Sequence, residues 1–495
     1  MDHWIFGANI NLGSEKISYF IPTFLALLGV LTKRARLTRL SAMGGQQQSV
    51  KMKKSRIIHP FFARWQSLLS GSSLFALLLG ALAFGLPSCI EDQCESTQTY
   101  FVFDPVYVQP TDFRKPIEVE TPRALETPGK IYYYNGYLLV NELRKGIHII
   151  DDRQAENPVA VSFISIPGNV DMAVRGGLLY ADNYVDLVVI NIENPAAPVF
   201  VGRTENVFPG LGAEDPQLGI LVEYVQREET QTLPCQEQRG DIFWFGGGVM
   251  VDESALDVFT ADNRGNIVPS ASSDVGVGGS MARFTLAMDH LYVVDDYQLH
   301  IFGLSSPESP QKVNTVSLGW GIETIFPYED KLFIGANSGM HIFDNSTPDN
   351  PQFLSTFQHA IACDPVFIDG NLAYVTLRDG NECQTFANQL DVVDVTNLTD
   401  PKLLKSHPMH NPHGLSKWGD ALLICENDEG LKIFDASEWD KIGSRLLSQS
   451  KGFNAYDVIT IGSRQLAIVI GQDGMHQFDI SDPARPVELS RIGVN

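Results

Sequence analysis

The chain has 495 residues, of which 44% are apolar and 19% are charged, and this composition is typical of globular proteins. Its 36 Lys and Arg residues against 59 Asp and Glu residues give a net charge of −23, which argues against nucleic acid as a partner because phosphate binding needs clustered positive charge. The length allows either about two to four ordinary domains or one large repeat architecture.

Residues 1–88 form a basic leader that we expect to be a targeting segment rather than part of the fold. They contain ten basic residues and only two acidic ones, so the rest of the chain carries a net charge of −31. Lys53, Lys54 and Arg56 precede the apolar run SLFALLLGALAFG, which is shorter than the roughly 20 residues of a membrane span. Residues 1–51 are either a first membrane helix or an over-extended start, because a complete signal begins at Met52.

The LPSC sequence that ends the leader resembles the lipobox of bacterial lipoproteins. In that family the cysteine is lipidated after cleavage, so the resemblance implies that Cys89 becomes the mature N-terminus. Pro87 departs from the usual lipobox, and an ordinary signal peptide or a signal anchor is the alternative. The pair Glu91-Asp92 is similar to a surface-export signal. We therefore expect an exported protein that is lipid-anchored to the outer membrane, facing either the periplasm or the cell surface.

The body of the chain repeats one pattern with a period of about 41 residues. In each unit an apolar strand is followed by a polar turn and a second apolar strand. The second strand of this pattern, which we place third among the four strands of a unit, ends at Asp151, Asn191, Gly303, Asp344, Asp394, Asp435 and Asp479. This period, with about four short strands in each unit, is typical of propeller blades. We therefore predict an all-β fold, a β-propeller of seven four-stranded blades, with eight blades as the alternative.

The propeller is expected over residues 125–495, with an insertion at about 205–280 that we interpret as an excursion from the outer edge of the third blade. Residues 89–124 are expected to form a tether with a candidate closing strand. Either that segment or the C-terminal strand closes the last blade. The Asp residues that end the repeated strands are expected to bind their own backbone in Asx turns rather than to ligate metals.

These units resemble the LVIVD-repeat family. The resemblance rests on LVVIN, LDVVD, GSMARF, CDPVFIDGNLAYVTLRDG and NPHGL, and it covers residues 125–495 apart from the insertion. The family is known as secreted or surface-associated propellers of undefined biochemistry, so the resemblance implies the fold and little about function.

Export to an oxidising compartment permits disulfide bonds. Cys363 precedes the first strand of the fifth blade, and Cys383 lies in the loop between its second and third strands. In a propeller these two loops lie on one face, so we predict a Cys363–Cys383 disulfide. Cys425 ends a second strand and is expected to be buried.

Polar residues recur where the innermost strands begin, at the mouth of the central channel. Aligning the units gives six candidate ligand-binding residues, which are Asp171, Arg283, Glu323, Asp364, His413 and Asp457. Carboxylates in such a ring are able to hold a divalent cation or to support glycosidase-type chemistry. The alternative is that they satisfy backbone groups and water around a plain channel. Histidines such as His148 and His300 occupy third strands and are not expected to converge on one metal.

Two functions remain open. The first is a non-enzymatic binding or interaction module that is anchored to the membrane by its lipid and recognises a protein or a glycan. The second is a hydrolase or lyase that uses ring carboxylates, with a divalent cation as its cofactor. We favour the first, because the recurrent loops contain no nucleophile–base pair.

Overall fold

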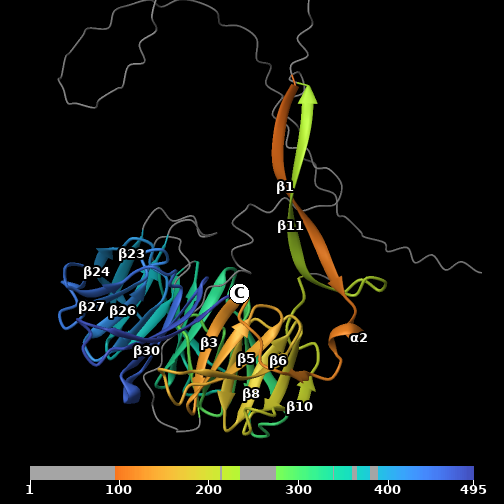
Figure 1. The fold of residues 1–495 in the computed structure, drawn as a ribbon, viewed down its shortest axis with the longest axis horizontal. Helices are drawn as coiled ribbons and strands as arrows, with labels where there is room; N and C mark the ends of the chain where they lie inside the picture. Colours follow the sequence, from red (N-terminus) through yellow and green to blue (C-terminus); the bar gives the residue numbers. More distant parts are fainter. Residues whose placement is uncertain (1–94, 212–213, 235–274, 338, 359–364, 379–387) are drawn as a thin grey trace, which may run out of the picture. The chain divides into compact units, whose positions relative to one another are not determined.

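The computed structural model describes residues 95–211, 214–234, 275–337, 339–358, 365–378 and 388–495. In these residues the fold is all-β, with seven blades of four antiparallel strands each, so the prediction of a seven-bladed propeller is confirmed (Figure 1). The eighth blade considered as the alternative is not formed by the described residues. None of the helices in this part of the chain is long and apolar enough to cross a membrane.

Each blade is built from four consecutive strands, from the innermost to the outermost. The first two blades contain β3 (Pro128–Tyr134), β4 (Tyr137–Glu142), β5 (Gly146–Asp151), β6 (Val159–Ser165), β7 (Met172–Arg175), β8 (Leu178–Asn183), β9 (Asp186–Asn191) and β10 (Val199–Thr204). The next two contain β13 (Phe284–Ala287), β14 (His290–Val294), β15 (Gln298–Gly303), β16 (Gln311–Ser317), β17 (Ile322–Tyr328), β18 (Lys331–Ala336), β19 (Gly339–Asp344) and β20 (Gln352–Phe357).

The last three blades follow the same order. They contain β21 (Val366–Asp369), β22 (Leu372–Leu377), β23 (Gln389–Asp394), β24 (Lys402–Pro408), β25 (Leu415–Trp418), β26 (Ala421–Cys425), β27 (Leu431–Asp435), β28 (Leu446–Ser450), β29 (Asp457–Ile461), β30 (Leu466–Gly471), β31 (Gly474–Asp479) and β32 (Val487–Gly493). Two 3₁₀ turns, η3 (Ile442–Ser444) and η4 (Gly462–Arg464), lie in the sixth and seventh blades. Cys425 is buried at the end of β26, as expected.

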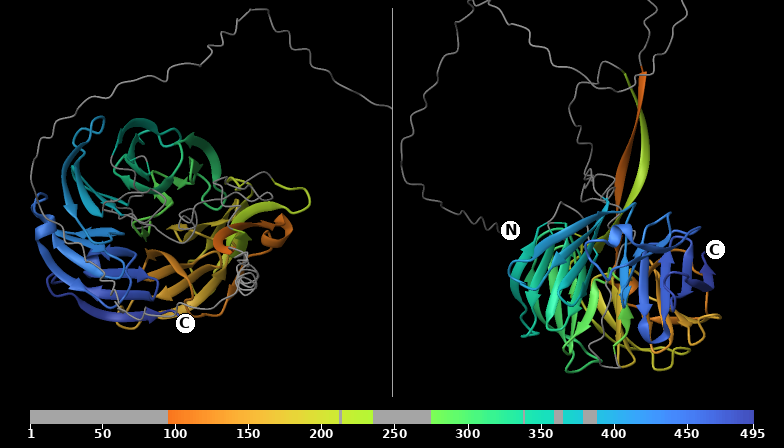
Figure 2. Two further views of the ribbon diagram at one scale, coloured as in Figure 1. Left: turned by 90° about the horizontal axis from the view of Figure 1, so that it is seen from above. Right: turned by 90° about the vertical axis from the view of Figure 1, so that its left-hand side faces the viewer.

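The blades close into a ring through their innermost strands (Figure 2). Neighbours around the ring are β3, β7, β13, β17, β21, β25 and β29, and β29 contacts β3 again. Of the two chain ends that we considered, the C-terminal one completes the seventh blade as its outermost strand, β32. The backbone N–H of Asn495 then donates to the carbonyl of Leu125 at 3.0 Å, so the end of the last blade is joined to the start of the first.

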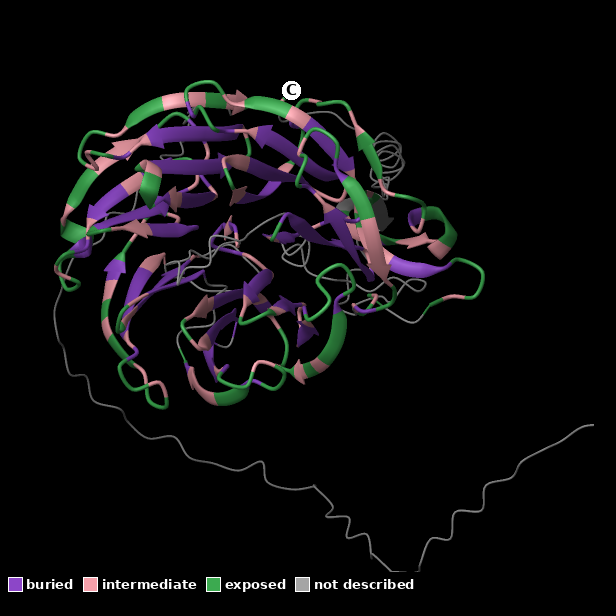
Figure 3. Cartoon of the chain, turned by 90° about the horizontal axis from the view of Figure 1, so that it is seen from below, coloured by how far each residue is buried: buried purple, intermediate pink, exposed green. Residues whose placement is uncertain are grey.

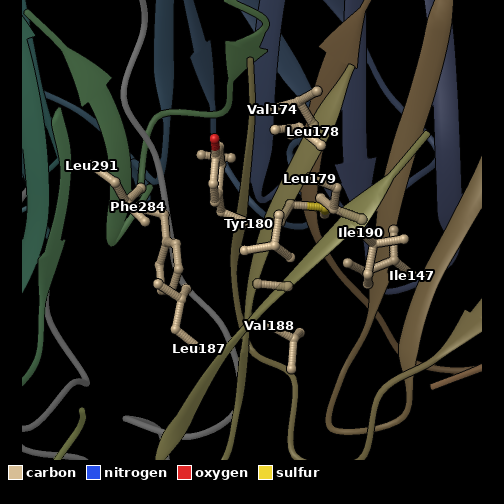
Figure 4. Packing of buried hydrophobic residues seen from close by; sticks show 14 of the residues in the cluster. Ile147, Val174, Leu178, Leu179, Tyr180, Leu187, Val188, Ile190, Phe284 and Leu291 are labelled. Atoms are coloured by element: carbon tan, nitrogen blue, oxygen red, sulfur yellow. The ribbon is translucent and has the colours of Figure 1, made fainter. Parts of the chain in front are cut away.

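Packing between neighbouring blades forms the core, because the second and third strands are buried on both faces (Figure 3). Tyr180 of β8 is fully buried among side chains of the first three blades, including Ile147 and Phe284 (Figure 4). Burying one such large side chain contributes about 1.5–3 kcal/mol. The sequence therefore shows continuous apolar runs where an antiparallel sheet with one wet face would alternate.

The Asp and Asn residues that end the third strands make the predicted Asx turns. Asp151, Asn191 and Asp344 each accept a hydrogen bond from the backbone N–H two residues further on, at 2.9–3.1 Å. Asp394, Asp435 and Asp479 do the same. The carboxylates and the amide therefore serve the turn that leads to the outermost strand.

Each outermost strand carries a β-bulge near its start, which the sequence analysis did not anticipate. The register with the third strand shifts by one residue in every blade, and the extra residue is always aliphatic; these residues are Val161, Val201, Val313, Leu354, Leu404, Leu447 and Leu489. Bulges twist an exposed strand and interrupt its ladder, and thereby hinder edge-to-edge association.

Three serines that directly follow these bulges fasten one blade to the next. The hydroxyls of Ser162, Ser355 and Ser448 donate to carbonyls in the third-to-fourth-strand turn of the following blade, at 2.6–2.7 Å. A side-chain hydrogen bond of this kind contributes about 1 kcal/mol.

The insertion leaves the propeller after β10, the outermost strand of the second blade, and not from the third blade as expected. Its strand β11 (Ile220–Pro234) pairs with β1 (Glu95–Val108) in a two-stranded ribbon. The short helix α2 (Pro110–Phe113) follows β1, and Phe113 packs with Val185 and Ile220 at the base of the ribbon. Strand β2 (Glu118–Glu120) then pairs with the outer edge of the first blade.

Candidate functional site

The end of the insertion returns to the inside of the ring, where it occupies the channel. We call residues 275–283 the plug segment. Its strand β12 (Val277–Gly278) pairs with the free inner edge of β3 in the first blade. On the other side, the N–H of Gly276 donates to the carbonyl of Val174 in β7 at 3.0 Å. The plug segment therefore lies between the innermost strands of the first two blades.

Two glycines allow the plug segment to come this close to its neighbours. A Cβ on Gly276 would lie 2.7 Å from the carbonyl oxygen of Tyr133, and a Cβ on Gly279 would lie 2.1 Å from Oδ2 of Asp457. Both distances are far below van der Waals contact, so any larger residue would force the segment out of its place.

Asp457 holds the plug segment from the seventh blade. This carboxylate is 2% exposed and accepts hydrogen bonds from the backbone N–H of Ser280 at 3.1 Å and from its hydroxyl at 3.2 Å. The Ser280 hydroxyl oxygen in turn accepts the backbone N–H of Leu415 in the sixth blade at 3.2 Å. One buried serine thus joins the insertion to two blades that lie more than a hundred residues further along the chain.

Asp171 and Lys130 hold the other end of the plug segment. The Asp171 carboxylate is buried and accepts the backbone N–H groups of Arg283 at 2.5 Å and Phe284 at 3.1 Å. The Lys130 ammonium donates to the carbonyl of Met281 at 2.7 Å and lies 3.6 Å from Oδ2 of Asp171. Burial lowers the pKa of Lys130, and the neighbouring Asp171 carboxylate opposes this shift.

Asp182 supports this arrangement from the end of β8. Its Oδ1 accepts the side-chain N–H of Asn169 at 2.8 Å and the backbone N–H groups of Val170 and Asp171, both at 2.9 Å. Burial raises the pKa of Asp182 to about 7. The residue fixes the turn that presents Asp171 to the plug segment.

Arg283 and Glu323 lie at the rim, where side chains are partly exposed. The Arg283 guanidinium forms an ion pair of 3.0 Å with Asp296 in the loop between β14 and β15. Burial lowers the pKa of Arg283, but the carboxylates of Asp296 and Glu323 outweigh this effect and the net shift is upward. The guanidinium therefore stays charged beside two acidic groups.

His413 lies on the opposite side of the mouth, two residues before β25. Its ring stacks on Tyr456 with 5.3 Å between the ring centroids, and Nη1 of Arg378 lies 2.7 Å from its Nδ1. The His413 backbone carbonyl accepts the hydroxyl of Thr376 at 2.6 Å. His413 is thus held by residues of the fifth blade, Thr376 and Arg378, and by Tyr456 directly before β29 of the seventh blade.

The structure brings part of the predicted ring together around the plug segment. Asp171, Arg283 and Asp457 meet there, Glu323 lies near Arg283, and His413 packs between two blades. Asp364, Cys89 and the predicted Cys363–Cys383 disulfide lie outside the described residues. Within the described residues, no group of three or more His, Cys, Asp or Glu side chains has an arrangement that would hold a metal ion.

The histidines of the third strands each pair within their own blade. His148 lies 3.0 Å from the Glu142 carboxylate, and His300 lies 2.6 Å from the Asp295 carboxylate. Burial raises the pKa of the Glu142 carboxyl, but hydrogen bonds from His148 and from two backbone N–H groups outweigh this effect, so that the net shift of the pKa is downward. These pairs brace the loops at the channel mouth.

Sequence reasoning missed Lys130, Ser280 and the plug segment itself. The signal that was available is the cluster of three glycines in residues 276–279, the last of which begins GSMARF, since clustered glycines permit close approach of backbones. Which blades the run would contact depends on pairing with β3, more than a hundred residues earlier in the chain, and this is not readable from local pattern.

The family model of the LVIVD repeat matches residues 168–205 and 362–407. The first match spans the second blade, and the second match spans the fifth blade. No curated protein sequence matches the chain.

Solved structures are similar to the chain at low sequence identity. Sqt1 from Saccharomyces cerevisiae has a TM-score of 0.44 and 9% identity, with 77% of this chain and 89% of that chain covered. The computationally designed Ika8 protein has a TM-score of 0.43 and 8% identity, with 76% and 91% covered. BamB from Moraxella catarrhalis has a TM-score of 0.42 and 8% identity, with 77% and 97% covered.

Proposed function

We propose that this chain, a seven-bladed propeller with LVIVD repeats, is an exported, lipid-anchored module that binds a protein or a glycan on the rim of its channel mouth. The proposal of export and lipid anchoring rests on the leader, in which Lys53 and Lys54 precede a short apolar run and the LPSC sequence ends at Cys89. The net charge of −31 after the leader argues against a nucleic-acid partner.

The plug segment is the observation that carries the binding role. The inward-facing carboxylates of Asp171 and Asp457 accept hydrogen bonds from backbone N–H groups and from the Ser280 hydroxyl of this segment. The centre of the channel mouth is therefore occupied by protein. The surface offered to a ligand is the surrounding rim of loops, on a scaffold in which seven blades are braced against one another.

The same contacts weigh against the alternative of a hydrolase or lyase. General acid–base chemistry requires a carboxyl group within hydrogen-bond reach of the substrate. Asp171 and Asp457 are at most 3% exposed, and both face amide donors of the plug segment. Catalysis by this pair would require displacement of the plug segment, whereas binding at the rim does not.

Two measurements test the proposal. The intact mass of the protein extracted from membranes should correspond to a chain that begins at Cys89 and carries lipid, and a mature chain that begins elsewhere would overturn the anchor. The full-length protein should turn over none of a panel of chromogenic glycosides and esters. Turnover that disappears in an Asp171→Asn variant with an unchanged unfolding midpoint would overturn the non-enzymatic role.

A further inference from the structure

Two aromatic side chains stand exposed on the rim of the channel mouth. Trp320 is 56% exposed and Tyr297 is 52% exposed. Trp320 lies in the connection from β16 to β17, and Tyr297 lies in the loop between β14 and β15. Connections of these two kinds end on the same face of a propeller. Large aromatic groups that a folded protein leaves in water are frequent anchors for ligands.

The loops that carry these aromatic groups are tied to each other. The N–H of Leu318 donates to the carbonyl of Tyr297 at 2.9 Å, and the N–H of Gly321 donates to the carbonyl of Asp296 at 2.9 Å. The Asp295 carboxylate accepts the N–H of Tyr297 at 2.7 Å. The two side chains are thus displayed from a cross-linked pair of loops, and little conformational entropy remains to be lost on binding.

Glycines on both sides of Trp320 explain how its side chain is turned outward. Gly319 and Gly321 have φ angles of +106° and +81°, in the left-handed region that other residues avoid. A Cβ on Gly321 would also lie 2.1 Å from Nδ2 of Asn337. The backbone of the Gly-Trp-Gly sequence therefore follows a path that only glycine adopts without strain at positions 319 and 321.

The two carboxylates in the loop that carries Tyr297 already have partners within the protein. Asp296 forms its ion pair with Arg283 at 3.0 Å, and Asp295 pairs with His300 at 2.6 Å. A site for a strongly cationic ligand would leave its carboxylates without such partners. The rim here offers aromatic faces together with hydrogen-bonding groups of both kinds, which suits an uncharged ligand with an apolar face and many hydroxyls.

We propose that Trp320 and Tyr297 form a binding platform for a neutral oligosaccharide. The C–H face of a pyranose ring packs on an aromatic face, and its hydroxyls bond to the carboxylate of Asp296 and the guanidinium of Arg283. This inference rests on the proposed binding function and narrows its ligand to a glycan.

The test uses the full-length chain in detergent on an array of printed neutral oligosaccharides, including hexamers of glucose and of N-acetylglucosamine. The wild-type protein should bind at least one of them. Trp320→Ala and Tyr297→Ala should each weaken that binding at least tenfold. Trp439→Ala is the matched control, because Trp439 is 37% exposed in a turn between β27 and β28 on the other face, and its binding should equal that of the wild type.

A Gly321→Ala variant keeps both aromatic groups and misdirects one of them, so it should bind as weakly as Trp320→Ala while its unfolding stays cooperative. Oligosaccharide binding that survives the Trp320→Ala change would overturn the platform and leave the proposed binding function standing. Failure of the wild type to bind any neutral oligosaccharide would overturn the glycan inference. The proposed function itself fails only on enzymatic turnover or on the absence of the lipid anchor, which this array does not measure.

Discussion

Replacing Asp457 with alanine tests whether the plug segment is held by the ring. The carboxylate is 2% exposed and accepts both the backbone N–H and the hydroxyl of Ser280. Hydrogen bonds to a charged acceptor contribute about 1.5–3 kcal/mol each, and a buried donor that loses its acceptor costs about 1–3 kcal/mol. Since the two donors belong to one residue and their losses are not additive, we expect Asp457→Ala to lower the free energy of unfolding by about 3 kcal/mol.

Urea unfolding followed by tryptophan fluorescence and by circular dichroism measures this loss. With a denaturant slope of about 3 kcal/mol per molar, the midpoint should fall by about 1 M. Asp457→Asn keeps one acceptor oxygen and should fall by about a third of that. Asp428→Ala is the surface control, because the Asp428 side chain is 70% exposed, and it should stay within about 0.5 kcal/mol of the wild type.

The reasoning would be refuted if Asp457→Ala unfolded at the midpoint of Asp428→Ala. Such a result would mean that Ser280 finds equivalent partners without the carboxylate. The contact between the plug segment and Asp457 would then contribute nothing to the stability of the propeller.

Three further changes have defined outcomes. Burial raises the pKa of Asp182 to about 7, so between pH 3.8 and pH 7 the folded state binds more protons than the unfolded state. The wild type should therefore lose stability relative to Asp182→Asn as pH rises from 4 to 7. A difference in unfolding free energy between these two proteins that stays flat from pH 4.5 to 8 contradicts this. Ser355→Ala removes a 2.6 Å bond to the carbonyl of Leu398 in the next blade and should cost about 1 kcal/mol in urea unfolding, and equality with the exposed control Ser305→Ala would show that this bond adds nothing. Cys89→Ser should move the protein from the membrane fraction to the soluble fraction, and a variant that still pellets with membranes would contradict lipidation at this residue.

The blades were predictable because each one repeats the same local chemistry. The apolar third strand and its terminal Asp, as at Asp344 and Asp394, give both the period and the turn that follows, and neither depends on distant parts of the chain. The bulges were not predicted, since an aliphatic residue such as Leu354 fits a regular outer strand as well as a bulged one. Their presence is decided by how each blade twists against the next.

The candidate site was predictable only in part. Alignment of the units places Asp171 and Asp457 where innermost strands begin, because that position recurs with the period. What these carboxylates contact does not recur. The plug segment belongs to a single insertion, and its partners Lys130 and Asp457 come from the first and the last blade, far apart in the chain. Such a pairing cannot be predicted from the local sequence pattern and is seen only in the structure.

Hydrogen exchange of the plug segment tests the central claim most directly. The Gly276 and Gly279 amides donate to carbonyls of β7 and β3, and the Ser280 amide donates to a buried carboxylate. In the full-length protein, residues 276–280 should therefore exchange as slowly as the inner strands of the propeller, over hours rather than seconds. Exchange of these amides within seconds, while β3 stays protected, would contradict a channel closed by the chain itself. The centre of the channel mouth would then be open to a ligand.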